Sequence, residues 1–354
     1  MSIHRFTATD FRCLEQIELK AGPQYNLIFG ANASGKTSLL EALAYLGRGK
    51  SFRGAPVSSL VRHGQHEFVL FGEVDNGARV SKVGVRNSRD GLEIRVDGDK
   101  EGGAAALAAA MPLQLIDPEV HALVSGGPEQ RRRFLDWIAF HVEHDYLDTW
   151  RRFRRTLKQR NAALRSGATA RVIRSWNAEF LELGARVDEV RRLALEVSED
   201  CLIEKGQTLL LHDVGFEYQP GWAKDKSLEE ALDAGLDRDV QLGATQSGPH
   251  RSDLKLIYDE RQAKRLVSRG QQKLLACSMI LGAAETAQTA LERPLLLLLD
   301  DPAAELDNDS LDRLMDQVVS LGAQIIATSL DREALEFPTD PTMFHVEHGQ
   351  LRQL

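Results

Sequence analysis

A glycine-rich stretch near the N-terminus has the residue types needed to bind phosphate. Residues 30–37 read GANASGKT, which matches the P-loop pattern G-x-x-x-x-G-K-T. In such a loop, backbone N–H groups at a helix N-terminus surround the phosphate oxygens, while the lysine contacts the β and γ phosphates. An apolar run ending at Phe29 and a helix expected over 37–46 supply the required strand and helix. We predict a nucleotide site made by nine residues: Gly30, Ala31, Asn32, Ala33, Ser34, Gly35, Lys36, Thr37 and Ser38.

A second stretch supplies the carboxylates that nucleotide hydrolysis requires. Residues 295–301 read LLLLLDD, an apolar strand that ends in two acidic residues. Hydrolysis needs one carboxylate at the end of a strand to hold Mg²⁺ and another to polarise the attacking water. We expect Thr37 and Asp300 to hold Mg²⁺, and Lys36 and Asp301 to act in catalysis. A strand ending in Asp-Asp is common by itself, but downstream of a P-loop it indicates a Walker B motif.

The start of a long helix carries a third motif. Ser268, Gly270 and Gln271 resemble the S-x-G-Q signature of ABC-type ATPases, which contacts the γ-phosphate held by another subunit. The alternative is that Ser268 only caps the helix. The order of P-loop, signature and Walker B favours the ABC interpretation, and Glu305 and Asp307 follow in the D-loop position.

Composition restricts the class of protein and its location. The 354 residues are 43% hydrophobic and 27% charged, which excludes a disordered chain. The longest aliphatic run, 295–299, is too short to span a bilayer, and the first ten residues lack an apolar signal segment. Three scattered cysteines favour a reducing compartment, and the ten histidines show no metal-ligand spacing. A cytoplasmic protein without membrane attachment is expected.

Positive charge is concentrated in the middle of the chain. The formal net charge is −8, yet residues 131–174 contain twelve basic and four acidic residues. A basic patch on an acidic protein can attract a polyanion such as DNA, and a solvated helix face is the alternative. DNA contacts are predicted for seven arginines: Arg131, Arg132, Arg133, Arg151, Arg152, Arg154 and Arg155.

The elements that must position these motifs fall into three segments. Residues 1–120 are expected to form mixed strands and helix with the P-loop, including an antiparallel meander over 68–96. Residues 121–240 read as an inserted helical lobe that contains an antiparallel helical hairpin, and residues 241–354 resume the α/β pattern with the signature and Walker B motifs. The predicted fold is α/β, an ABC-type P-loop ATPase head split in sequence by a short coiled-coil-like lobe. One apolar stripe with near-heptad spacing defines the longer helix of that lobe: Val172, Trp176, Phe180, Leu183, Val187, Val190, Ala194, Val197 and Cys201.

Six stretches of the chain resemble patterns of the RecF family of bacterial DNA replication and repair ATPases. The resemblance spans nearly the whole chain, and the stretch PEVHALVSGGPEQRRRFLD at 118–136 is specific to that family. The other five are 29–37, 46–53, 243–251, 268–271, and 299–301 with 305–307.

The resemblance implies an ABC-type head, related to the SMC ATPases, that uses ATP and Mg²⁺. It implies a homodimer that forms on ATP and binds double-stranded or gapped DNA. It also implies partnership with RecO and RecR in loading RecA, within DNA replication, DNA repair and the SOS response to DNA damage. ATP hydrolysis would then be a weak, DNA-stimulated switch that resets the dimer.

Some positions depart from the ABC pattern or match it only in part. Ala33 stands where such P-loops usually have glycine, which matters if that residue needs a positive φ. Thr328 and Ser329 follow the strand where ABC transporters place a switch histidine, which argues against rapid hydrolysis. Gln114 lies near the position of a metal-contacting glutamine, but inside an apolar run.

Three other classes of protein compete with this interpretation. An SMC-like chromosome-maintenance ATPase would need a coiled coil of hundreds of residues, whereas the insert has roughly 120. The ATPase subunit of a membrane transporter would not explain the insert or the stretch 118–136. A DNA-binding scaffold with a structural nucleotide is disfavoured by Asp301 beside Asp300.

Overall fold

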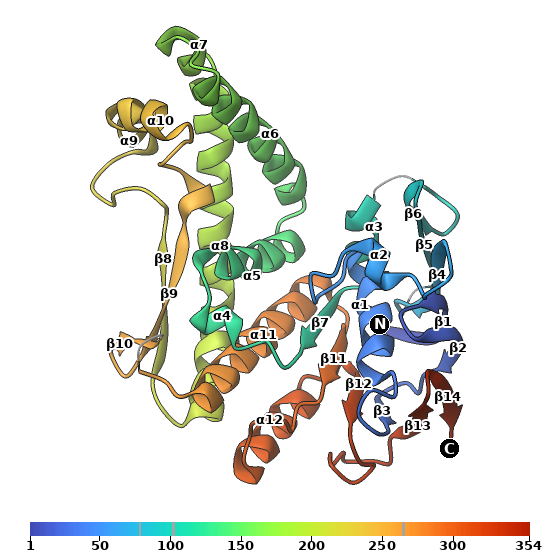
Figure 1. Cartoon of the computed structure of the whole chain (residues 1–354). Coiled ribbons are helices and arrows are strands. Elements are labelled where there is room, and N and C mark those ends of the chain that lie inside the picture. Colours follow the sequence, from blue (N-terminus) through green and yellow to red (C-terminus); the bar gives the residue numbers. More distant parts are fainter. Residues whose placement is uncertain (78, 101–102, 264–265) are drawn as a thin grey trace. The chain divides into compact units, whose positions relative to one another are not determined.

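The chain divides into two compact units (Figure 1). A computed structural model describes residues 1–77, 79–100, 103–263 and 266–354. Unit 1 combines Met1–Val120 with Glu292–Leu354, and unit 2 contains His121–Leu291. Unit 1 is therefore assembled from the two ends of the chain, as the split α/β pattern of the sequence indicates.

A six-stranded sheet with the order β14-β13-β3-β12-β11-β7 carries the nucleotide-binding motifs of unit 1. All its strand pairs are parallel except β13 with β14. Every residue of β11 and β12 is buried, which explains why both read as unbroken apolar runs. Helix α12 connects them, so the predicted βαβ unit is confirmed. The bounds are β3 (Tyr25–Phe29), β7 (Leu113–Ile116), β11 (Leu296–Asp300), α12 (Asn308–Ser320), β12 (Gln324–Ser329), β13 (Thr342–Glu347) and β14 (Gln350–Gln353).

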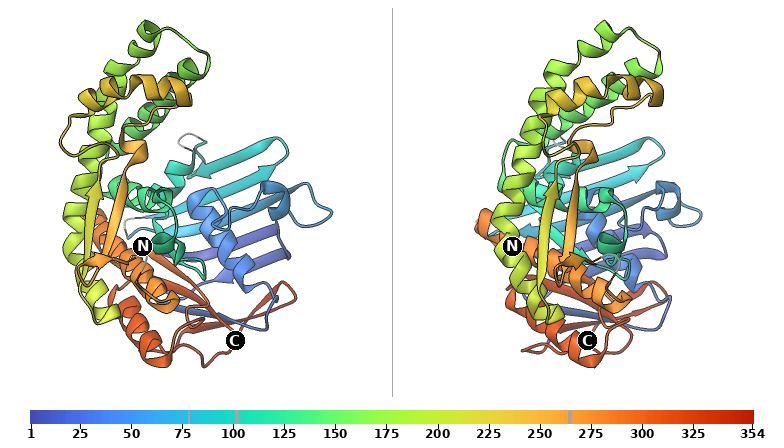
Figure 2. Two further views of the ribbon diagram at one scale, coloured as in Figure 1. Left: turned by 60° about the vertical axis from the view of Figure 1, so that its left-hand side comes forward. Right: turned by 90° about the vertical axis from the view of Figure 1, so that its left-hand side faces the viewer.

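A second sheet of unit 1 has five antiparallel strands in the order β2-β1-β4-β5-β6. It contains the predicted meander, which is visible in both views of Figure 2. Helix α1 contacts strands of both sheets, and Phe11, Tyr45 and Phe68 pack edge to face in the core between them. The bounds are β1 (Ser2–Phe11), β2 (Leu14–Lys20), α1 (Lys36–Arg48), α2 (Val57–Leu60), β4 (Glu67–Asp75), β5 (Val80–Ser88), β6 (Gly91–Val96) and α3 (Gly103–Ala110).

Unit 2 is built on helix α8, which has 34 residues and is about 51 Å long. Helices α5, α6 and α11 pack against it, and a three-stranded sheet, β10-β9-β8, lies beside it (Figure 2). The helices are α4 (Ala122–Ser125), α5 (Pro128–Val142), α6 (Tyr146–Arg165), α7 (Ala170–Arg174), α8 (Asn177–Leu210), α9 (Leu228–Ala234), α10 (Leu236–Leu242) and α11 (Arg269–Leu291), with a 3₁₀ turn η1 (Pro249–Arg251). The strands are β8 (Val214–Gln219), β9 (Asp253–Tyr258) and β10 (Arg261–Gln262).

The boundary between the units differs from the predicted one. The sequence pattern places 241–291 with the nucleotide-binding segment, whereas contacts group these residues with unit 2. The reason is long-range pairing, because β9 pairs with β8 and α11 packs along α8. Such pairing leaves no local signal in the sequence.

The near-heptad stripe is partly wrong. Phe180, Val187 and Ala194 are buried as predicted, but Val197 is 45% exposed and Val172 is 47% exposed. An undistorted α-helix drifts by roughly 20° per heptad, so a stripe at period 3.5 leaves the packed face after a few turns. Val172 lies in the separate helix α7, which ends before α8 begins. The buried face of α8 follows the ordinary helical period instead.

Among the described residues, one helix is long and apolar enough to cross a membrane by length and composition. This helix is α11, and 67% of its most apolar segment is buried inside the protein. It packs against α8, α5 and α4. Core packing therefore accounts for its apolar composition.

Candidate nucleotide site

The P-loop follows the central strand β3 of the six-stranded sheet. Residues 30–35 connect β3 to α1, whose first residue is Lys36. Gly30 has φ 152° and Gly35 has φ 117°, conformations that favour glycine. A Cβ at Gly30 would lie 2.3 Å from the carbonyl oxygen of Val346. The backbone therefore requires glycine at both ends of the loop.

Ala33 has φ 61°, in the left-handed region. This conformation costs an L-residue roughly 1–2 kcal/mol, so alanine here is strained where glycine would not be. The backbone N–H of Ser34 donates to the carbonyl oxygen of Ala31 at 3.2 Å, and Gly349 N–H donates to that of Ser34 at 2.9 Å. These bonds hold the turn in spite of the strain.

Two side chains of the loop fit a phosphate ligand. The buried hydroxyl of Ser34 has no hydrogen-bond partner in the described part of the chain. The ammonium of Lys36 lies 2.6 Å from the carbonyl oxygen of Gly30 and 3.0 Å from that of Ala31. Burial lowers the pKa of Lys36, while the negative charges of Asp301 and Asp300 oppose that shift. An unsatisfied hydroxyl and a buried cation are the groups that phosphate oxygens would satisfy.

Thr37 and Asp300 come together as the Mg²⁺ prediction requires. The Thr37 hydroxyl lies 3.1 Å from Oδ1 of Asp300, and the Thr328 hydroxyl donates to the same oxygen at 2.8 Å. Burial raises the pKa of Asp300, and the two hydroxyl groups oppose that shift. Mg²⁺ prefers such hydroxyl and carboxylate oxygens, so these residues fit the ion. No group of three His, Cys, Asp or Glu side chains that could hold another metal occurs in the described ranges.

Asp301 follows the strand in a left-handed conformation, with φ 49°. Its backbone N–H donates to the Thr328 hydroxyl at 3.0 Å. Thr328 therefore joins the backbone of Asp301 to the carboxylate of Asp300. The sequence pattern by itself gives Thr328 no such role, although its place at the end of β12 beside β11 is the signal that points to it.

A further carboxyl group at this edge of the sheet is Asp117. It directly follows β7, and the register pairs Ile116 with Leu299, so Asp117 and Asp300 leave neighbouring strands at the same end. Burial raises the pKa of Asp117 to about 6, with a smaller contribution from the charge of Asp300. Gln114 accepts a long hydrogen bond from Arg48 at 3.5 Å. The sequence signal for Asp117 is an acidic residue that ends a short apolar strand.

The signature residues lie in unit 2 and form a capping box at the start of α11. The Gln271 backbone N–H donates to the Ser268 hydroxyl at 3.3 Å, and the Ser268 N–H donates to the Gln271 side-chain oxygen at 2.9 Å. Gly270 lies in the first turn of this helix. Both sequence interpretations of Ser268, cap and signature, are therefore compatible with its position.

The D-loop residues follow Asp301 in unit 1. Glu305 has φ 68°. The Asp307 carboxylate accepts from the Ser310 backbone N–H at 2.8 Å and caps α12. This hydrogen bond lowers the pKa of Asp307.

The seven arginines predicted to contact DNA separate into two groups. Arg131 is buried and forms a bidentate ion pair with Asp253, at 2.7 and 3.1 Å, so it serves the packing of unit 2 and is not free for phosphate. Arg132 donates to the Ser252 carbonyl oxygen at 2.7 Å. The remaining five arginines are exposed. Arg133 pairs with Glu129, and the other four lie on α6: Arg151, Arg152, Arg154 and Arg155.

Comparison with known proteins defines the fold first. The structure described as the recombination mediator protein RecF-ATP in the RecFOR pathway matches with a TM-score of 0.90 and 25% identity, over 99% of this chain and 97% of that chain. The Smc head domain of Pyrococcus furiosus matches in fold, with a TM-score of 0.62 and 15% identity, over 99% of this chain and 95% of that chain. The chain thus has the ABC-type ATPase fold shared by these proteins.

The sequence comparisons identify the family. The family described as RecF/RecN/SMC N terminal domain matches residues 2–350. The DNA replication and repair protein RecF of Chromohalobacter salexigens is 40% identical over 362 residues, covering 99% of both chains. That of Azotobacter vinelandii is 39% identical over 361 residues, covering 100% of this chain and 99% of the relative. The chain belongs to the RecF family of DNA replication and repair proteins.

Proposed function

We propose that the protein is a slow, DNA-stimulated ATPase that dimerises on ATP and binds double-stranded or gapped DNA. The observation that carries the proposal is the joint position of Lys36, Thr37 and Asp300. The buried ammonium, the threonine hydroxyl and the carboxylate meet where P-loop and Walker B chemistry needs them.

Each group has a distinct task in this proposal. The P-loop N–H groups and Lys36 bind the phosphates of ATP, and Thr37 and Asp300 hold Mg²⁺. Bound Mg²⁺ would neutralise charge on the phosphates. Asp301 polarises the attacking water, and Ser268 of a second protomer completes the site. Hydrolysis then resets the dimer.

The partners follow from the basic surface and the family. The exposed arginines of α6 contact DNA phosphates, which supply a sequence-independent attraction. A relative of known structure is described as a recombination mediator in the RecFOR pathway. We infer that this protein acts with RecO and RecR in the cytoplasm and loads RecA at gaps, and that relationship supports the inference.

Phosphate release with and without duplex DNA tests the proposal, together with sedimentation with ATP, ADP or no nucleotide. Asp301→Asn should keep ATP binding, slow turnover by about 10²-fold and accumulate the ATP-bound dimer. The exposed Asp312 on α12 supplies the matched control, because Asp312→Asn should change neither the rate of turnover nor the amount of ATP-bound dimer.

If the protein were instead a DNA-binding scaffold with a structural nucleotide, the same assay should give the opposite result. Such a protein would bind ATP and DNA without releasing phosphate, and Asp301→Asn would change nothing. Unchanged turnover in an active Asp301→Asn protein would instead move the catalytic role to Glu305.

A further inference from the structure

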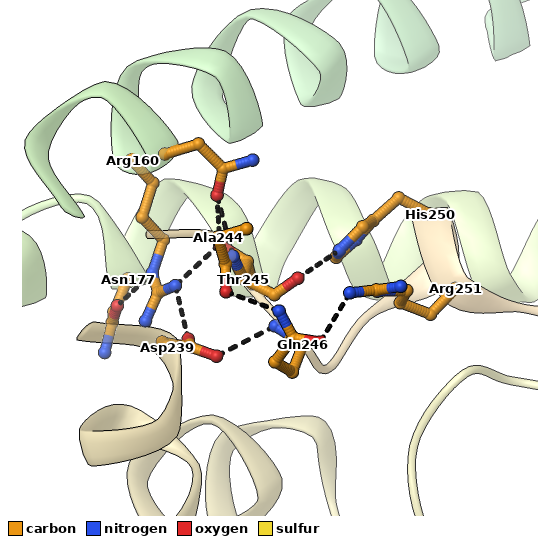
Figure 3. Close-up of polar contacts among 9 residues, drawn as sticks. Arg160, Asn177, Asp239, Ala244, Thr245, Gln246, His250 and Arg251 are labelled. Atoms are coloured by element: carbon orange, nitrogen blue, oxygen red, sulfur yellow. Dashed lines mark hydrogen bonds and ion pairs between the residues drawn. The ribbon is translucent and has the colours of Figure 1, made fainter. Parts of the chain in front are cut away.

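The family-like stretch Gly243–Arg251 is not used by the nucleotide site, and it folds around a buried arginine (Figure 3). Arg160 of α6 is fully buried, and its Nη1 donates to Oδ2 of Asp239 and to the Thr245 hydroxyl, both at 2.7 Å. The other oxygen of Asp239 accepts from the Gln246 backbone N–H at 2.8 Å. This buried, hydrogen-bonded ion pair therefore fixes the position of Gln246.

Gln246 in turn orients an exposed cation. Its side-chain oxygen accepts from Nη2 of Arg251 at 2.5 Å (Figure 3). The pKa of the neighbouring His250 is lowered to about 4, by burial first and also by the charges of Arg251, Arg132 and Arg191. The guanidinium of Arg251 itself is exposed, and the partner that fixes its direction is the neutral side chain of Gln246.

A cavity of about 390 Å³ lies beside Arg251. Its described lining is Gln219, Pro220, Gly221, Trp222, Lys224 and Arg251. Gly221 has φ 92°, and a Cβ there would lie 2.3 Å from the Gly248 carbonyl oxygen. The Gly248 N–H donates to the Gly221 carbonyl oxygen at 3.3 Å. The segment after β8 and the 243–251 stretch are therefore joined backbone to backbone at the cavity.

The described lining combines two cations, an indole and a carboxamide without a carboxylate. Lys224 forms an ion pair with Glu217, whose carboxylate also pairs with Lys255 at 3.2 Å, so these three side chains together contribute one net positive charge beside the cavity. Trp222 is half-buried, so part of its surface is accessible. Sites for single-stranded nucleic acid combine cations along the backbone with aromatic rings on which bases stack. Bases within a duplex are already stacked on one another and do not offer a face to an indole.

We propose that this cavity binds one nucleotide of single-stranded DNA, with its phosphate on Arg251 and Lys224 and its base against Trp222. The proposal rests on the DNA binding proposed above and deepens it. A duplex-binding face on α6 and a single-strand site in the same unit together favour DNA that contains a gap over plain duplex.

Fluorescence anisotropy with labelled oligothymidylate, duplex DNA and gapped duplex, each with ATP, tests the proposal. Trp222→Ala should weaken binding to oligothymidylate and to gapped DNA by about tenfold, because each stacked base contributes roughly 1–3 kcal/mol. Binding to duplex should not change, which also reports that the variant is folded. Trp222→Phe should restore most of the affinity, and Arg251→Gln should weaken single-strand binding. Lys226→Ala is the control, because Lys226 is exposed but lies outside the cavity lining, so its removal should not change single-strand binding.

The outcomes separate this proposal from the function on which it rests. Wild-type protein that binds duplex but not oligothymidylate, or a Trp222→Ala protein with unchanged single-strand affinity, would overturn the cavity assignment alone. A change in tryptophan fluorescence that is present in the wild type, lost in Trp222→Phe and caused by poly-glutamate but not by oligothymidylate would also overturn it, in favour of an acidic protein segment. Absence of all DNA binding by the wild type would overturn the proposed function as well.

Discussion

At the scale of single residues, the P-loop contains one strained position that a substitution should relieve. Ala33 has φ 61°. Ala33→Gly removes a left-handed cost of roughly 1–2 kcal/mol and adds roughly 0.4–1 kcal/mol of unfolded-state entropy. We expect a net stabilisation of about 0.5–1 kcal/mol, measured by chemical denaturation without nucleotide.

Ala31 supplies the matched control for this substitution. It is not among the described residues with positive φ. Ala31→Gly therefore gains no relief and should destabilise the protein by roughly 0.4–1 kcal/mol. Equal effects of the two substitutions would contradict the strain at Ala33.

Thr328 is expected to link stability with metal-dependent activity. Its hydroxyl donates to Asp300 and accepts from the Asp301 N–H. Thr328→Val keeps the shape, removes the acceptor of the Asp301 N–H and leaves Asp300 with the Thr37 hydroxyl alone. This should cost roughly 1–3 kcal/mol of stability and weaken Mg²⁺-dependent turnover. Thr328→Ser keeps the hydroxyl and should retain most of both. Denaturation and an Mg²⁺ titration of phosphate release measure the two effects, and a Val variant that matches the wild type in both would refute the link.

The raised pKa of Asp117 predicts that the stability of the protein depends on pH. Its pKa is raised from the ordinary value of 3.8 to about 6, so the folded state holds the proton more tightly than the unfolded chain. The resulting stabilisation is present below about pH 4 and is lost as pH rises through about 6. Asp117→Asn cannot ionise, so its stability relative to wild type should increase between pH 4 and 7 in metal-free buffer. A difference that is constant across this range would rule out the raised pKa.

At the scale of elements, α6 predicts the salt dependence of DNA binding. The four arginines of α6 that are predicted to contact DNA would release about 0.9 counterion each, which gives a slope of log K against log[salt] of about −3.6 per protomer. Replacing Arg154 and Arg155 by alanine should reduce the slope by about 1.8 without changing ATP binding. The same double change at Arg86 and Arg95 of unit 1 is the control. If only this control flattens the slope, the DNA surface lies on unit 1.

Elements with strong local signals could be predicted from sequence. The P-loop, the apolar strands around α12 and the meander with its Asn-Gly and Asp-Gly turns all have patterns contained within about 30 residues. Long-range pairing could not be predicted. Arg131 looks like a surface charge, yet its partner Asp253 is 122 residues away. The raised pKa of Asp117 likewise depends on burial within the folded sheet.

At the scale of the whole molecule, the P-loop and the signature belong to different compact units. If Ser268 serves a second protomer, Ser268→Arg should keep ATP affinity but abolish ATP-induced dimerisation, because a cation at the helix N-terminus is unfavourable. Ser268→Ala is the control, since it removes the cap without adding charge. Sedimentation with ATP distinguishes the two variants.

Mixing Ser268→Arg with Lys36→Ala extends this prediction. Each mixed dimer has one composite site with both defects and one intact site. Recovery of phosphate release would show that the two sites act independently. Absence of phosphate release from the mixture would show that both sites must be filled. Full activity and ATP-dependent dimers of Ser268→Arg alone would refute the shared site.

The order of strands in the six-stranded sheet also determines when the protein can become competent during synthesis. The two hydrogen-bonded neighbours of β3 are β12 and β13, about 300 residues further along the chain. The P-loop that follows β3 also depends on Gly349, which donates to the carbonyl oxygen of Ser34. During translation, the residues of the apolar β3 therefore have no strand partners while the whole of unit 2 is being synthesised. The P-loop is thus the first motif to be translated and among the last whose strand partners and backbone contacts become available.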